Sequence, residues 1–177
     1  MNKIILLVFF CLPGIVSAQI EKASKTETLR LEWPKSEHWK VGDQQEYGVQ
    51  RTVDLVHENE SVIEWTELGN MTSVKGMTGI PVDTAMYMMF LSAVAKAVDP
   101  KLTFIQKGQM QDCPWILFSI EAQGFKNDTT PESQLWYVLQ GKQGLYTNFI
   151  AIKSSKLPVE FKQKWTTFFL NGRLMYD

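Results

Sequence analysis

Residues 131–172 constrain the fold of this chain most, because their pattern of strand, tight turn, strand and helix is the clearest in the sequence. In 134–140, and again in 145–153, apolar side chains fall on both faces of an extended chain, and such a strand needs cover on both sides. The insert Gly141-Lys142-Gln143-Gly144 has glycine at each end, which can take the positive φ of a tight hairpin. We therefore expect two neighbouring strands in the middle of a sheet.

A helix is predicted over 158–171, directly after this hairpin. Pro158 suits a first helical turn, and Gly172 is placed to end the helix in a left-handed conformation. Burying the aromatic side chains of this helix would contribute about 1.5–3 kcal/mol each, so the helix is expected to lie on the sheet. Four aromatic residues form its stripe, at i, i+4, i+7 and i+8: Phe161, Trp165, Phe168 and Phe169.

A second helix is predicted over 82–98, with Asp83 as its cap and Asp99-Pro100 as its stop. Apolar residues cover most of its circumference. Met86, Met89 and Phe90 are the candidate binding residues, because adaptable thioethers suit a groove for a protein or an apolar ligand. Core packing is the alternative, since Met and Phe at helical spacing are usually interior.

The other predicted strands precede and follow this helix in the sequence. Alternation predicts strands at 46–56, 62–68, 102–107 and 115–122, a loop at 70–81, and an edge strand near Leu29 and Leu31 that stops before Pro34. The predicted fold class is α+β, an antiparallel sheet covered by two main helices, 82–98 and 158–171. The predicted organisation is a signal peptide (1–18), an N-terminal extension with the edge strand (19–43) and one α+β domain (44–177).

The first residues have the pattern of a secretory signal. Lys3 supplies the positive region, 4–11 the apolar core and Val16-Ser17-Ala18 a cleavage site of small residues. The apolar run is too short to span a bilayer. We therefore expect export, to the periplasm or outside the cell, after cleavage near Ala18, and no transmembrane segment in the mature chain.

The sequence contains no recognisable catalytic or metal-binding motif, neither GxSxG, GxGxxG, a Walker loop nor HExxH. No catalytic residue, metal or cofactor is therefore predicted. A cation could in principle gather Asp54, His57, Glu58 and Glu60, but solvated charges at a turn account for them better. The net charge of −1 gives no electrostatic reason to expect nucleic acid as a partner.

Cys113 is the single cysteine expected in the mature chain, so an internal disulfide is not expected. Its apolar neighbours favour a small buried hydrophobic side chain. The alternative is a thiol-dependent enzyme with Cys113 as the nucleophile and His38 or His57 as the base.

The hairpin at 134–153, the aromatic helix after it and the long strand from Glu46 together resemble the α/β/α sandwich of the PsbP/Mog1-like group. Further segments are similar to small exported bacterial proteins of unassigned function, and the resemblance covers about 42–172. Binding and assembly-factor roles recur in that group, so the resemblance implies a non-catalytic binding or envelope-assembly accessory domain of unknown ligand. These segments are Trp65-Thr66-Glu67, Pro131-Glu132, Trp136, Gln140-Gly141, Leu145-Tyr146 and Trp165.

Overall fold

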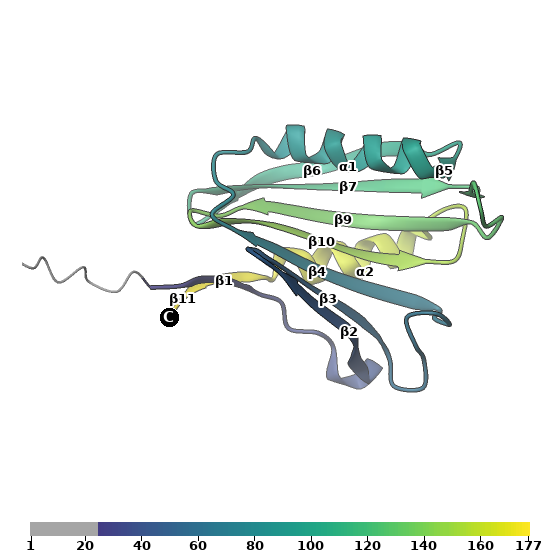
Figure 1. The fold of residues 1–177 in the computed structure, drawn as a ribbon, viewed down its shortest axis with the longest axis horizontal. Helices are drawn as coiled ribbons and strands as arrows, with labels where there is room; N and C mark the ends of the chain where they lie inside the picture. Colours follow the sequence, from purple (N-terminus) through teal and green to yellow (C-terminus); the bar gives the residue numbers. More distant parts are fainter. Residues whose placement is uncertain (1–24) are drawn as a thin grey trace, which may run out of the picture.

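The hairpin of β9 (Glu132–Gln140) and β10 (Gly144–Ile152) lies at the centre of a seven-stranded antiparallel sheet. The strand order is β2-β3-β4-β10-β9-β7-β6, so both hairpin strands have neighbours on each side, as predicted (Figure 1). The turn differs from the prediction, because neither Gly141 nor Gly144 has a positive φ. Glycine at 141 instead lets the Glu27 carboxylate approach the backbone of the turn, since a Cβ at 141 would overlap this carboxylate.

The structure is a computed structural model and describes residues 25–177, so the predicted signal peptide lies outside the described residues. Two small two-stranded sheets, β1 with β11 and β5 with β8, accompany the main sheet. The remaining elements are β1 (Glu27–Arg30), η1 (Lys35–Glu37), β2 (Trp39–Tyr47), β3 (Gln50–His57), β4 (Glu67–Lys75), α1 (Val82–Lys96), β5 (Ala97–Val98), β6 (Lys101–Met110), β7 (Cys113–Ala122), β8 (Gly124–Phe125), α2 (Val159–Leu170) and β11 (Arg173–Tyr176).

The two helices cover opposite faces of the main sheet. Side chains alternate along β7, so Ile116 and Phe118 join the apolar cluster beneath α1, which we call the front-face cluster. Leu117 joins the other cluster with Trp165 and Phe169 of α2, which we call the back-face cluster. This arrangement confirms the predicted fold class, an α+β protein with an antiparallel sheet and two main helices.

Helix α2 packs through the predicted aromatic stripe. Trp165 and Phe169 are fully buried, and Phe161 and Phe168 pack partly buried against the same cluster. The helix begins after Pro158, which occupies the N-cap position without a side-chain cap. The predicted left-handed end at Gly172 is wrong, because this residue has no positive φ. A Cβ at 172 would instead press on the side chain of Leu31, so the lack of a side chain is what the position requires.

The N-terminal strand β1 does not extend an edge of the main sheet. It pairs antiparallel with β11, a strand that the sequence patterns did not predict, and the two form a ribbon at the two ends of the described chain (Figure 1). Leu29 and Leu174, opposite each other in this ribbon, are both buried in the back-face cluster. The segment predicted as an extension therefore supplies part of the core.

The region predicted as one strand over 46–56 is a hairpin. Gly48, at φ 58°, turns the chain between β2 and β3. The next strand, predicted at 62–68, is β4 at Glu67–Lys75, so most of it lies in the predicted loop. The reason is chemical, because Asn70 donates to Asp54 at 2.7 Å and Thr72 pairs with Thr52 at 3.1 Å across neighbouring strands. Cross-strand hydrogen bonds replace apolar alternation here.

Helix α1 begins at the predicted residue, Val82, but without the predicted cap. Pro81 is the N-cap residue and no side chain caps the helix. The Asp83 carboxylate binds Lys107 of β6 instead, at 3.0 Å. The helix ends at Lys96, two residues early, because 97 and 98 form β5 and pair with β8.

Candidate functional site

Helix α1 uses its apolar residues in two directions, and the predicted binding residues face inward. Met86, Met89 and Phe90 are half-buried and pack against the front-face cluster, next to the buried Val82 and Ala85. These three side chains therefore lie as the core-packing alternative predicts. They hold the helix on the sheet and are not arranged as an open groove.

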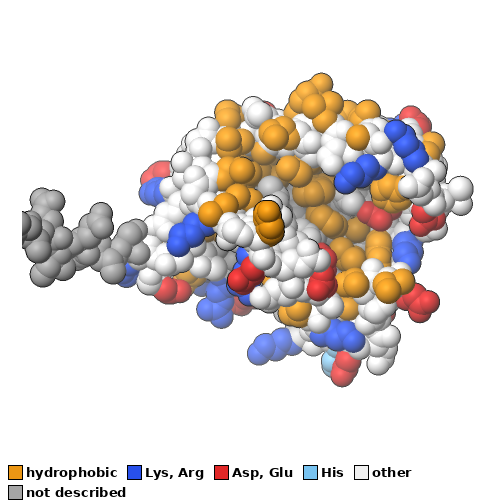
Figure 2. All heavy atoms as spheres, viewed as in Figure 1, with side chains coloured by type: hydrophobic (Ala, Val, Ile, Leu, Met, Phe, Trp, Pro, Cys, Tyr) orange, Lys and Arg blue, Asp and Glu red, His pale blue; other side chains and the backbone are white. Residues whose placement is uncertain are grey.

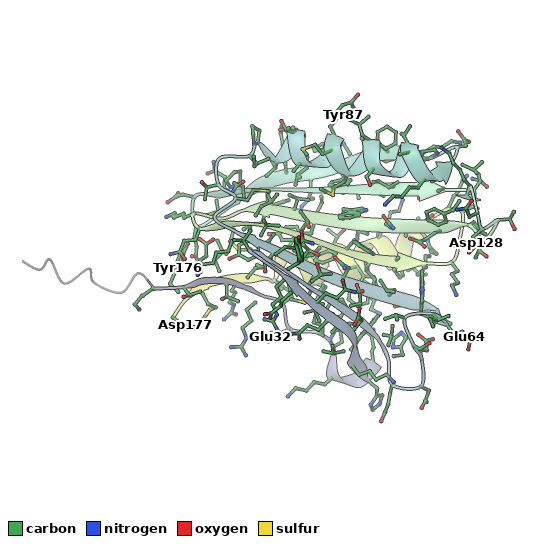
Figure 3. All side chains as sticks on the ribbon, viewed as in Figure 1. Glu32, Glu64, Tyr87, Asp128, Tyr176 and Asp177 are labelled. Atoms are coloured by element: carbon green, nitrogen blue, oxygen red, sulfur yellow. The ribbon has the colours of Figure 1, made fainter. Side chains whose placement is uncertain are left out.

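The outward side of α1 is also apolar. The relative exposure of its four large side chains lies between 46 and 57 %. We call Tyr87, Met88, Leu91 and Val94 the α1 outer face. In Figure 2 hydrophobic side chains gather over α1 at the top of the molecule, and in Figure 3 Tyr87 projects from α1 away from the sheet. Exposed apolar patches of this kind mark interaction sites more often than exposed single residues do.

The spacing of the α1 outer face is that of a helix surface, since residues 87, 91 and 94 recur at four and three positions. Sequence reasoning identified the helix but not this face. The reason is that the polar residues Thr84, Ser92 and Lys96 mark only a narrow stripe of α1. The pattern therefore does not show that the apolar side chains beside this stripe are exposed as well.

Charged side chains border the α1 outer face at both ends. At the N-terminal end Asp83 and Lys107 neutralise each other. At the C-terminal end the Lys126 ammonium donates to the carbonyl of Ala95 at 2.7 Å, which suits the negative end of the helix dipole. The exposed Lys96 lies in the same last turn. The apolar surface thus has a polar rim, as protein interfaces do.

Cys113 is buried, with 2 % of its surface exposed, at the start of β7. Burial raises the pKa of its thiol above the ordinary value, and the nearby Glu27 carboxylate raises this pKa further. A thiol with a raised pKa is a weak nucleophile at neutral pH because little thiolate is present.

The structure does not bring a histidine to this thiol. His57 ends β3, which is four strands away from β7 in the sheet, so the two are about 19 Å apart across the strands. The His57 ring lies 2.9 Å from the carbonyl of Glu37 and 3.9 Å from the Glu67 carboxylate. His38, in the exposed segment before β2, lies 3.8 Å from Glu58. The arrangement needed for a thiol-dependent enzyme is not formed.

The carboxylates near His57 each have their own hydrogen-bond donors. The Asp54 carboxylate accepts from Asn70, while Glu60 accepts from the backbone and side chain of Thr66. Among residues 25–177 no three His, Cys, Asp or Glu side chains are grouped so that they could hold a metal ion. In the same part of the chain, no helix combines the length and apolar character needed to cross a bilayer.

Comparison with known proteins does not assign this chain. Neither the scan against protein-family models nor the search of curated proteins produced a match.

Proposed function

We propose that this protein is an exported, non-catalytic binding domain that docks a protein partner through the α1 outer face, in the manner of an envelope-assembly accessory protein. The observation that carries the proposal is the exposure of four large apolar side chains on one side of a helix whose other side already packs the core. Burying the exposed half of each would contribute about 1 kcal/mol per side chain, enough to matter for docking.

Two further observations support the proposal. The signal-like pattern at 1–18 favours export, into a compartment where envelope assemblies form. A sheet with one helix on each face is also the layering that a PsbP/Mog1-like sandwich would have, and binding roles recur in that group. We infer membership of that group from this likeness of layering and from the residues quoted above.

The test places a photo-reactive amino acid at Leu91 in living cells, with Val159 as the matched control. Val159 is equally apolar and 65 % exposed, but it begins α2 on the opposite side of the sheet. A defined protein should cross-link at 91 and not at 159. The purified protein should then bind the purified cross-linked partner. The double variant Met88→Ser/Leu91→Ser should reduce the affinity about tenfold or more, and Val159→Ser should leave the affinity unchanged.

The double variant should remain folded, because both side chains point away from the front-face cluster. Met89→Asp is the opposite control and should unfold the protein, since this side chain packs on the sheet. Equal cross-linking at 91 and 159, or unchanged affinity of the double variant, would show that the α1 outer face is not the docking surface.

A further inference from the structure

The strand β1 has one paired edge and one edge without a strand beside it. Thr26 and Asp177 exchange both backbone hydrogen bonds, at 2.7 and 3.1 Å. Because bonded and non-bonded pairs alternate in an antiparallel ladder, Thr28 bonds to Met175 in the same way, whereas the N–H and C=O of Leu29 point away from β11.

The first residue on this second edge is satisfied by side chains. The N–H of Glu27 donates to Gln143 Oε1 at 3.0 Å, and its C=O accepts from the Tyr146 hydroxyl at 3.0 Å. No equivalent partner for the N–H or C=O of Leu29 lies within residues 25–177. Leu29 is only 4 % exposed, and nearly all main-chain groups at buried positions are hydrogen-bonded. Leu29 therefore offers one N–H and one C=O to a further strand at this edge.

A groove follows the same edge. A cavity of about 80 Å³ is lined by Thr28, Leu29 and Met71. A second cavity, of about 340 Å³, shares these residues and extends to Met175 and Asp177 at the end of β11. Val53 lines the smaller one and is the cross-strand partner of Met71 on the β3–β4 pair, so an apolar pair lies in the groove among polar side chains.

The end of the groove near Glu27 is charged. A third cavity, of about 270 Å³, is lined there by Arg51, Lys75, Glu46 and Glu27. The Glu27 carboxylate accepts hydrogen bonds from two backbone N–H groups and two tyrosine hydroxyls and has no cationic partner within residues 25–177. Glu46 lies 3.4 Å from Arg51, and both are largely exposed to solvent. Arg51 thus has a carboxylate partner, whereas the Lys75 ammonium forms no ion pair within residues 25–177 and is open to a carboxylate of a ligand.

We propose that the free edge of β1 binds an extended peptide as a third strand of the β1–β11 ribbon. The peptide pairs with the N–H and C=O of Leu29, places an aliphatic side chain on Val53 and Met71, and directs a carboxylate to Arg51 and Lys75. Strand addition of this kind takes its affinity from main-chain hydrogen bonds and its selectivity from alternate side chains. The site is separate from the α1 outer face and does not depend on it.

The test uses a synthetic probe, the hexapeptide Thr-Val-Thr-Val-Thr-Asp with a free C-terminus, and amide hydrogen exchange measured by NMR. In the free protein the Leu29 amide should exchange faster than those of Thr28 and Arg30, which bond to β11. At saturating peptide the exchange of Leu29 should slow about tenfold or more, while Thr28 and Arg30 change little. Failure of the peptide to slow exchange at Leu29, or protection of Leu29 in the free protein, would overturn the proposal.

Matched peptides and variants test the orientation. N-methylation of one set of alternate peptide amides should abolish binding and methylation of the other set should not, because only one set faces β1. Val53→Asp should weaken binding of the peptide about tenfold. Arg51→Gln should weaken binding of the peptide with its free carboxylates severalfold. The same variant should not weaken binding of a peptide that has an amidated C-terminus and Asn in place of Asp. Leu91→Ser on α1 is the control and should leave peptide binding unchanged.

Two other results would overturn strand addition. Equal binding of both N-methylated peptides would mean that side chains alone hold the ligand. Protection of Leu29 that rises with protein concentration in the absence of peptide, together with dimer formation in sedimentation, would mean that a second copy of the chain occupies the edge.

Discussion

The Tyr176 hydroxyl donates a hydrogen bond to Glu27 Oε2 at 2.9 Å, and so joins the last strand of the chain to the first. The same carboxylate accepts from the backbone N–H groups of Lys142 and Gln143 in the β9–β10 turn. One buried side chain thus ties both ends of the described chain to the central hairpin. The β1 ribbon, and with it the proposed peptide edge, depends on this cluster.

Replacement of Glu27 by Ala should destabilise the protein by about 2–4 kcal/mol. The variant leaves two turn N–H groups and the Tyr176 hydroxyl without their acceptor, whereas the Tyr146 hydroxyl keeps the backbone carbonyl of residue 27. An unsatisfied buried donor costs about 1–3 kcal/mol. Urea denaturation followed by circular dichroism measures the loss. Glu32→Ala, at an exposed position two residues after β1, is the control and should change stability by less than about 0.5 kcal/mol. Similar small losses in both variants would show that the cluster contributes little.

Stability should fall at alkaline pH because of Tyr176. Burial, and then the hydrogen bond to Glu27, raise the pKa of Tyr176 to about 12. An ordinary tyrosine has a pKa of about 10, so the unfolded chain loses this proton first. The stabilisation is therefore complete below about pH 10 and is lost as the pH rises toward 12. Urea denaturation at a series of pH values should show this decline.

The comparison for this decline is Tyr176→Phe. The variant should be less stable than the parent protein at pH 8, because a hydrogen bond is missing, and the difference should shrink above pH 10. Burial also raises the pKa of Tyr137 and Tyr146, so the variant should retain part of the decline. A difference that stays constant from pH 8 to 12 would contradict the assignment to Tyr176.

Gly69→Ala should destabilise the protein by about 1–3 kcal/mol, the usual cost of overpacking. A Cβ at this position of β4 would overlap the Trp33 indole, which lies against Trp39 at a centroid distance of 4.9 Å. The near-ultraviolet circular dichroism of the tryptophan cluster should change at the same time. Ser73→Ala on the same strand is the matched control and should have little effect on either measurement. An equal response of the two variants would show that the Trp33 contact is unimportant.

The Cys113 thiol should be inert in the folded protein. Because it is buried and its pKa is raised, an aromatic disulfide reagent at pH 8 should react about 100-fold more slowly with it than with a free thiol. The same thiol should react at once in guanidinium chloride. The chain from Gln19 onward suits the measurement, since Cys113 is then its single cysteine. Fast reaction of the native protein would restore the thiol-enzyme hypothesis.

Local patterns were sufficient for the centre of the fold. The strands at 134–140 and 145–153 and the helix after them repeat apolar residues with the period of their own secondary structure, so each can be read without its neighbours. The partnership of β1 with β11 could not be read, because about 145 residues separate the two strands and neither has a long pattern. Similarly, β4 lacks alternation because Asn70 and Thr72 bond to polar partners on β3.

The candidate site likewise has one part that local sequence patterns predict and one part that depends on packing between distant segments. Composition and spacing act within one segment, so they were enough to predict a helix that begins at Val82 and is apolar around most of its circumference, although it ends at Lys96 and not at 98. Which side of that helix is covered was decided only by the tertiary structure, through the packing of Met86, Met89 and Phe90 on β7 and β9. Burial is a relation between segments, so the narrow polar stripe of this helix could not show how far its exposed side extends.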